Sequence, residues 1–399
     1  MKRGQKADLK IVNRGILECV LLVILFALPL FPGNAADSSV VGQKISAQNP
    51  SKMSGRILGD PSKIVFPSLK FDCGYIGFLR HHRIIIENRF FGPRLVDLSG
   101  PGWPLNFEIP KVMRRGSFGL AGSVAPLPGW FGAIGAQNNR GRDYCCIWDA
   151  TDRKPVFVWD DAGSIGAPIT ISEAGFLVAY GGKGGVIVRS FRGGVPRLFL
   201  FPKKHGSSIP VHYSLMFDGS GKRLFAATNN QILCWDAAKG KILWRVRAPK
   251  LLATYSGLAY LPSRNGMPLV ACGAVSHRPK GPRDILVDSV LLLNALTGAL
   301  VHQISIPGST PRAMAHPARM FLLGTLAAAP DGRALAVTQI VGLGFGRVFI
   351  VGRSKWHIVY RTGWIPGGPW LGLAFSRKGG TIAGSGIGRV WVWRLRRRY

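Results

Sequence analysis

The sequence predicts an all-β fold built from repeated small antiparallel sheets, and three observations lead to it. Hydrophobic residues make up 47% of the 399 positions, with 52 Gly and 27 Pro, which suits short buried strands joined by tight turns. Residues 371–394 hold three short apolar runs separated by Gly-containing turns. Degraded copies of this unit recur upstream. Such repetition predicts a β-propeller, a ring of small sheets.

The N-terminus has the pattern of an export signal. An apolar run over residues 16–31 precedes the small residues Gly33 and Ala35. The basic residues ahead of this run are Lys2, Arg3, Lys6, Lys10 and Arg14. This order predicts a signal peptide over residues 1–35, cut after Ala35, with a retained signal anchor as the alternative. Either way we expect the rest of the chain to be exported, periplasmic or extracellular.

Residues 36–69 are expected to form a linker that contains a ring-closing strand. The first part, residues 36–60, is rich in Ser, Gly, Asn and Lys and has no sustained period. The chain ends six residues after Trp393, which leaves little room for a fourth strand in the last blade. We expect residues 63–66 to supply that strand, because closure by one chain end protects a ring against opening. Residues 395–399 are the alternative.

Residues 70–399 are predicted to form seven blades of four antiparallel strands in a monomeric ring. The predicted third strands recur about every 40 to 60 residues, as blades do, at 94–97, 145–149, 186–189, 232–236, 291–294, 348–351 and 390–393. First and second strands are expected at the hairpins 169–171/177–179, 213–217/224–227 and 324–328/334–337, whose turns contain Gly. Fourth strands are expected at 155–159, 197–201, 241–246, 299–304 and 356–360.

The repeats resemble those of WD-repeat proteins. The resemblance spans residues 70–399 and is most specific at 371–394 and 213–246, where the third strands end in Val390-Trp391-Val392-Trp393 and in Trp235-Asp236. No Gly-His pair occurs, and Asn230 and Ile387 replace the Asp that the family carries before the third strand. The resemblance implies a propeller with a binding or scaffolding role, but not the family's internal hydrogen-bond network.

A second resemblance concerns residues 234–244, which are similar to the docking repeat of quinone-dependent alcohol dehydrogenase propellers. Residues 293–298 echo it. In that family the motif packs one blade against the next, so it implies structure and no cofactor. A quinone enzyme would also need a Ca²⁺ site made of carboxylates, and the 19 acidic residues are scattered along the chain. We expect no cofactor and no metal.

Adjacent cysteines are the first candidates for chemistry. Cys145 and Cys146 lie in a predicted third strand, where Cys serves as a small apolar side chain. Cys73, Cys234 and Cys272 occupy similar strand positions, and no Cys-x-x-Cys spacing is present. We expect buried, unreactive thiols.

Two other pairs carry charge. His81-His82, with Arg80 and Arg83, is expected to form a solvated hairpin turn rather than a site for an anion or a metal, because adjacent strand side chains point to opposite faces. The pair at 160–161, Asp-Asp, is expected in a loop that enters the next blade. No Ser-His-Asp, Walker or Rossmann pattern is present.

The charge balance predicts an anionic partner. Lys and Arg number 52 against 19 Asp and Glu, a formal net charge of +33. Such a field attracts acidic ligands with strong salt dependence. We expect an acidic protein, with anionic lipid or acidic glycan as alternatives, and export argues against nucleic acid. The alternative is that the proteins of the source organism are basic in general, in which case the positive charge has no specific partner. The candidate contact residues are Arg114, Arg115, Arg140, Arg142, Lys203, Lys204, Arg278, Lys280 and Arg283.

Taken together, the sequence predicts an exported or membrane-tethered binding scaffold and not an enzyme. Its contact surface is expected at the end of the ring that carries the turns between fourth and first strands, where loops vary without disturbing the sheets. The alternative is a periplasmic propeller enzyme of the lactonase, lyase or quinone-dependent dehydrogenase type. That alternative requires carboxylates or histidines that converge in the central channel.

Overall fold

The computed structural model describes Arg56–Ile57, Ser62–Val65 and most of the chain from Cys73 to Leu395. Within that stretch the gaps are 81, 89–91, 100–103, 114–117, 126–128, 137–142, 164–166, 173–175, 183–184, 201–212, 229–230, 248–251, 264–266, 277–286, 308–320, 342–344, 367, 369–371 and 387–388. The chain divides into two compact units, Met1–Lys52 and Met53–Tyr399, and every described element belongs to the second. The predicted signal segment therefore lies outside the described residues. In the described part, no helix has the length and apolarity to cross a membrane.

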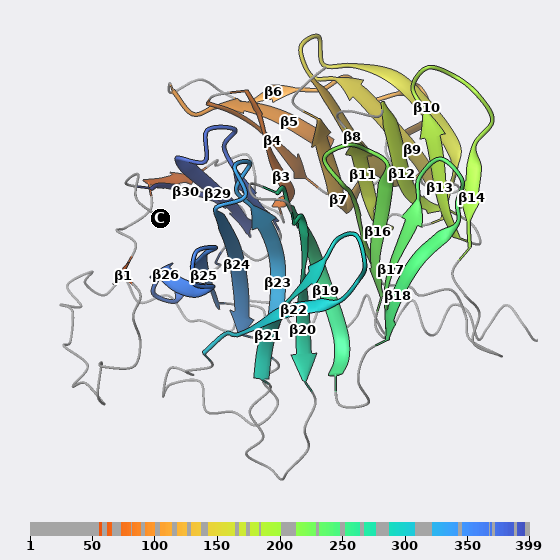
Figure 1. Ribbon diagram of the computed structural model, residues 1–399. Coiled ribbons are helices and arrows are strands. Elements are labelled where there is room, and N and C mark those ends of the chain that lie inside the picture. The colour runs from red at the N-terminus through yellow and green to blue at the C-terminus, as the bar shows by residue number, and fades with distance from the viewer. Residues whose placement is uncertain are drawn as a thin grey trace, which may run out of the picture. The chain divides into compact units, whose positions relative to one another are not determined.

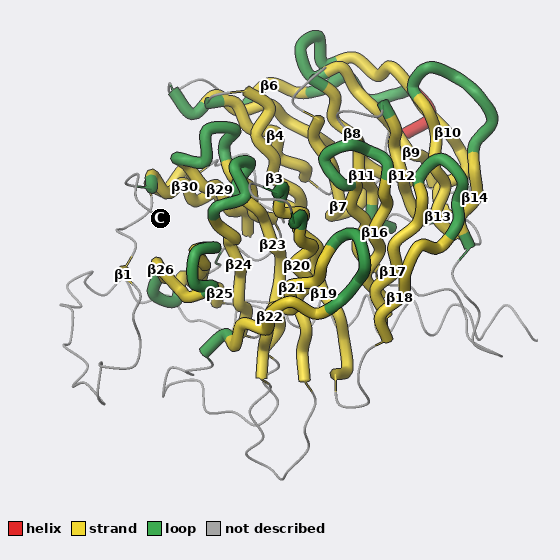
Figure 2. The backbone as a smooth tube through the Cα atoms, in the orientation of Figure 1, coloured by secondary structure: helices red, strands yellow, loops and turns green. Residues whose placement is uncertain are grey.

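Almost all described secondary structure is strand, as Figure 2 shows. The strands of the first two blades are β3 (Cys73–Arg80), β4 (Arg83–Asn88), β5 (Gly92–Asp97) and β6 (Leu105–Asn106), then β7 (Phe118–Ala125), β8 (Trp130–Ala136), β9 (Asp143–Asp149) and β10 (Lys154–Ala162). The third and fourth blades hold β11 (Ile169–Ser172), β12 (Leu177–Gly182), β13 (Gly185–Ser190) and β14 (Arg197–Phe199), then β15 (Tyr213–Phe217), β16 (Arg223–Thr228), β17 (Gln231–Asp236) and β18 (Ile242–Arg247).

The remaining blades complete the order in the chain. They hold β19 (Leu252–Leu261), β20 (Leu269–Ser276), β21 (Val287–Asn294) and β22 (Leu300–Ser305), then β23 (Phe321–Ala328), β24 (Ala334–Val341), β25 (Phe345–Gly352), β26 (His357–Arg361) and β27 (Ile365–Pro366), then β28 (Gly372–Phe375), β29 (Thr381–Gly386) and β30 (Arg389–Arg394). A single 3₁₀ turn, η2 (Lys111–Met113), follows β6 among the described elements. The predicted first to fourth strands quoted above all coincide with or overlap observed strands.

The first strands of successive blades contact one another in a closed circuit. The contacts run from β3 to β7, β11, β15, β19, β23 and β28, and β28 contacts β3 again. Figure 1 shows the sheets following one another in chain order. A closed circuit of four-stranded antiparallel sheets is the geometry of a propeller, and this circuit fits seven blades.

The N-terminal segment closes the ring. β2 (Ser62–Val65) pairs antiparallel with β30, with Ile64 opposite Val390. This confirms the predicted N-terminal closure and its expected position within one residue. β1 (Arg56–Ile57), which the sequence did not predict, pairs parallel with β26 of the sixth blade. One short segment therefore pairs with two neighbouring blades.

The hydrophobic core lies between neighbouring blades. Each buried cluster draws on two of them, as Phe225 and Cys234 of the fourth blade do with Val270 and Cys272 of the fifth. The last such cluster joins the first and seventh blades, where Ile84 lies with Val390. Because both faces of each sheet are covered, the third strands are apolar at nearly every position rather than at every second one.

Candidate functional site

All nine residues that the sequence nominated for an anionic partner lie outside the described residues: Arg114, Arg115, Arg140, Arg142, Lys203, Lys204, Arg278, Lys280 and Arg283. Most connections between fourth and first strands fall in the same gaps. The predicted contact end of the ring therefore stays a prediction. The described residues do, however, show how charge is distributed over the blades themselves.

Two long segments carry most of the excess positive charge, and the second, residues 289–399, has 14 Lys and Arg against one acidic residue, Asp331. The first, residues 174–283, contains 17 Lys and Arg and only two acidic residues, Asp218 and Asp236. Both acids of the first segment are engaged within turns. Asp218 accepts hydrogen bonds from the backbone N–H of Arg223 and the hydroxyl of Ser220. Asp236 accepts from the backbone N–H groups of residues 238 and 239. The third, fourth and fifth blades therefore carry a large cationic excess.

Like charges lie close together on β18. Its burial pattern leaves Arg245 and Arg247 exposed on one face, two residues apart. Partial burial, and then the positive charge of Arg247, lower the pKa of Arg245. Two neighbouring cations raise each other's free energy, so an anion placed beside them would be stabilised.

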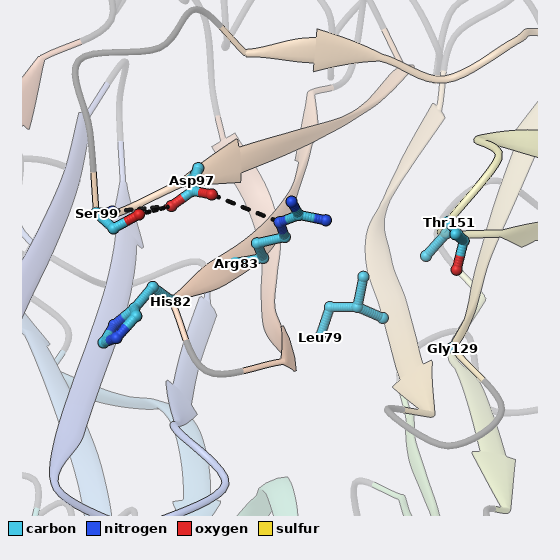
Figure 3. A pocket seen from close by; sticks show the side chains of 8 residues that line it. Leu79, His82, Arg83, Asp97, Ser99, Gly129 and Thr151 are labelled. Carbon is cyan, nitrogen blue, oxygen red and sulfur yellow. Dashed lines mark hydrogen bonds and ion pairs between the residues drawn. The ribbon is translucent and has the colours of Figure 1, made fainter.

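A hollow of about 290 Å³ lies between the first and second blades (Figure 3). Its lining is Leu79, His82, Arg83, Asp97, Ser99, Gly129, Ala150 and Thr151. Asp97 lies 3.5 Å from the Arg83 Nε and accepts from the backbone N–H of Ser99 at 2.9 Å. The hydrogen bonds from Ser99, and then Arg83, lower the pKa of Asp97.

This hollow does not concentrate unbalanced charge. Its single described ion pair is exposed, and the two partners largely satisfy each other. The predicted turn is confirmed for His82 and Arg83, which lie where β3 turns into β4, while His81 lies outside the described residues. Across the described residues, no three His, Cys, Asp or Glu side chains gather where they could hold a metal ion.

The prediction that Asp160 and Asp161 form a loop is wrong. Both belong to β10, whose residues alternate between exposed and partly buried. Asp161 accepts a 2.7 Å hydrogen bond from the Tyr180 hydroxyl and pairs with the Arg189 guanidinium of the third blade. At the end of the strand, Ala162 pairs with Gly182 of β12. Asp161 therefore links the second blade to the third, where Tyr180 and Arg189 satisfy its carboxylate.

Comparison with solved structures identifies the architecture. A chain in the crystal structure of a mitotic checkpoint complex matches at TM-score 0.60 and 15% identity, covering 90% of this chain and 99% of that one. The β-propeller domain of Cps50 (Swd1) from Myceliophteria thermophila matches at TM-score 0.54 and 12% identity, covering 84% and 98%. This chain has the fold of a β-propeller. No protein-family model and no curated protein matches the sequence.

The segment that resembles a quinone-enzyme docking repeat packs one propeller blade on the next, as the resemblance implied. The Trp244 Nε1–H of the fourth blade donates to the carbonyl of Ala295 in the fifth, at 3.2 Å. Gly298 lies against the indole, since a methyl group at its Cα would come within 2.7 Å of the ring. The same arrangement recurs one blade earlier, where Phe199 lies against Gly240. These residues are structural.

Four cysteines of the propeller are buried, as predicted from their strand positions, while the side chain of Cys73 lies outside the described part of the structure. Cys145, Cys146, Cys234 and Cys272 are all fully buried and unpaired. Burial raises the pKa of each thiol, to about 12 for Cys234. A buried thiol that stays protonated is a poor nucleophile, so these positions carry no described chemistry.

Two of the buried charged residues, Glu87 and Arg347, were missed by the sequence reasoning. Glu87 follows Ile86 on β4 and is fully buried. Arg347 is 4% exposed, donates to the Gln339 side chain at 2.7 Å and lies over the Trp364 ring. Each interrupts an apolar strand, but strand period alone does not say which face another blade covers.

Proposed function

We propose that this propeller is a binding or scaffolding module whose basic surface takes an acidic protein partner, and that it works after export from the cytoplasm. One observation carries the proposal: 17 basic residues against two acidic ones over residues 174–283, with both acids held in turns. Folding does not require such an imbalance, because like charges oppose compaction. The propeller fold supports a binding role, since it presents many loops on a rigid ring.

The electrostatic field would act on both rate and specificity. A surface of one sign steers oppositely charged partners and speeds association, and this gain falls as salt screens the charges. At physiological ionic strength screening sets in over about 8 Å, so cations close to the partner dominate. Exposed Arg245 and Arg247 satisfy this condition for any partner that reaches the outer edge of the fourth blade.

A salt-graded capture with matched variants tests the proposal. The full chain is immobilised, exposed to cell-envelope extract and eluted with rising NaCl, and the eluted proteins are purified and tested singly. The test variant reverses Lys241, Arg245 and Arg247 to Glu. The control variant reverses Lys154, Lys355 and Lys378, which are exposed outside residues 174–283. We expect an acidic protein whose binding falls steeply with salt and is lost in the test variant alone.

Other outcomes would contradict the proposal. Equal loss in both variants would mean that binding follows net charge and not residues 174–283. If the bound proteins are not eluted by NaCl, or if no protein is bound, the proposal of an acidic protein partner is wrong. Either result would favour the enzymatic alternative.

Export has its own test. Cell fractionation with intact-mass analysis should find the chain outside the cytoplasm, either beginning at Ala36 in the soluble envelope fraction or retaining residues 1–35 in the membrane fraction. The first result indicates cleavage after Ala35, and the second indicates a retained anchor. A full-length chain in the cytoplasm would contradict export.

A further inference from the structure

Large aliphatic side chains are exposed on the outer strands of the third and fourth blades. Leu198 and Leu200, on and just after β14, are 52% and 58% exposed, and Leu243 on β18 is 44% exposed. Val195, just before β14, is 87% exposed. Single exposed aliphatics are ordinary, but several on the outermost strands of adjacent blades require an explanation.

Packing between the blades makes these positions continuous. Phe199 points inward, with its ring 6.1 Å from the Trp235 ring and against Gly240 in the turn that leads to β18. Its strand neighbours Leu198 and Leu200 therefore point outward beside that turn. Figure 1 shows β14 and β18 as the outer strands of successive sheets.

Basic side chains lie among these aliphatics. Lys241 follows Gly240 directly, and Arg245 and Arg247 alternate with the inward-facing residues of β18. Between residues 237 and 283 the sequence has no acidic residue at all. We call this surface the apolar basic rim, made of Leu198, Leu200, Leu243, Lys241, Arg245 and Arg247.

Other outer strands differ from the rim. β10 exposes Val156 and Val158, but between Lys154 and the acidic Asp160. The outer strand of the sixth blade is paired with β1, and β30 of the seventh is paired with β2. β22 of the fifth blade exposes Leu300 and Val301 but contains no Lys or Arg. Among the described outer strands, exposed aliphatics and cations without acids therefore coincide on the third and fourth blades.

We propose that the apolar basic rim docks on an anionic phospholipid bilayer. Aliphatic side chains gain free energy when they enter the boundary between headgroups and acyl chains, and cations gain it beside anionic headgroups. A bilayer offers both environments over a broad area, whereas an acidic protein surface would leave the aliphatics in water. The inference shares Lys241, Arg245 and Arg247 with the proposed function. The aliphatics distinguish the two, because an acidic protein held by charge alone would not need Leu198 and Leu200.

Hydrogen exchange on the full chain tests the docking. The chain is mixed with vesicles of phosphatidylcholine alone or of phosphatidylcholine with phosphatidylglycerol, and exchange is read in peptides over 191–200 and 239–247. A local readout is needed because the apolar run at residues 16–31 could hold the chain on any vesicle. We expect slower exchange in these peptides with anionic vesicles only.

Two rim variants and a matched control separate the contributions. Leu198→Ser with Leu200→Ser removes the aliphatics, and Arg245→Ser with Arg247→Ser removes the cations. Either should abolish the protection. Val156→Ser with Val158→Ser removes comparably exposed aliphatics from β10 and should retain it. Circular dichroism melts check that all variants fold.

Several outcomes would overturn the proposal. They are absence of protection, equal protection by neutral vesicles, or protection that survives in both rim variants. Protection by an acidic protein but not by vesicles would place the rim in a protein interface instead. Protection that depends on chain concentration without vesicles would indicate a second copy as its occupant.

Discussion

The turn after the third strand repeats the same side-chain chemistry in three blades. Asp149, Asp236 and Asn294 each use one side-chain oxygen to accept from backbone N–H groups two and three residues ahead. Four residues after each of them the backbone has a left-handed conformation, at Arg153, Gly240 and Gly298. The repeat therefore preserves a turn geometry even where the residue changes.

Gly298 is the residue-scale test of blade packing. Its φ is 75°, and a Cβ would lie 2.7 Å from the Trp244 Cε3. We expect Gly298→Ala to lower the free energy of unfolding by about 2 to 4 kcal/mol, from backbone strain plus overpacking. Gly193→Ala is the control, because its φ is 92° and nothing lies within 4 Å of a Cβ there. Urea unfolding of both variants measures the difference, and equal losses would mean that the contact with Trp244 contributes nothing.

Glu87 is the residue-scale test of buried charge. Both carboxylate oxygens lack a hydrogen-bond partner in the described part of the chain, and burial raises the pKa well above its ordinary value. Because the pKa of Glu87 is higher in the folded chain than in the unfolded chain, Glu87 destabilises the protein least below about pH 4.5. Its contribution to the free energy of unfolding then falls as the pH rises toward the folded-state pKa. Glu87→Gln should therefore gain thermal stability over the unmodified chain, and gain more at about pH 8 than at about pH 5. Exposed Glu108→Gln is the control, and a pH-independent gain would contradict the assignment.

At the scale of elements, strands that leave their own blade hold neighbouring blades together. β10 reaches β12 of the third blade through Ala162, and the Asp161–Arg189 pair supports that extension. β1 and β2 lie on the sixth and seventh blades. Pairing across the closure matters because the ring otherwise depends on side-chain packing between its first and last blades.

Replacement of β2 tests the closure. In the native chain, β2 pairs with β30 from Ser62 opposite Val392 to Val65 opposite Arg389. Substituting Gly-Ser-Gly-Ser for residues 62–65 removes the side chains that support this pairing. We expect the melting temperature to fall by roughly 3 to 8 °C, because β30 loses its outer partner. The same replacement over residues 396–399 tests the alternative closing segment and should change little. A larger loss from the second replacement would reverse the assignment.

At the scale of the whole molecule, net charge opposes compactness. A formal charge of +33 repels itself, and dissolved salt screens that repulsion. We expect the melting temperature to rise by roughly 2 to 5 °C between about 0.05 and 0.5 M NaCl. Reversing Lys154, Lys241, Arg245 and Arg247 to Glu lowers the charge by 8, from +33 to +25, and should flatten this dependence. A melting temperature that falls with salt would show that attractive ion pairs outweigh the repulsion.

The repeating unit and the all-β ring could be predicted from the amino-acid sequence alone. The apolar third strands and the Gly-containing turns carry their information locally, since a strand and its hairpin partner are neighbours in the chain. The closing strand was expected at residues 63–66, and β2 at Ser62–Val65 lies within one residue of that position. Sequence also fixed the size of the charge imbalance.

Which faces of the strands are covered, and by which residues, could not be predicted before the contacts between blades were known. Asp160 and Asp161 were expected in a loop, but both lie in β10, where Asp161 has partners on the third blade. Glu87 is buried, and Leu198 is exposed, although both follow the period of a strand. The strand period tells which residues share a face of the sheet. Whether that face is buried depends on how the neighbouring blade packs against it, which the period does not show.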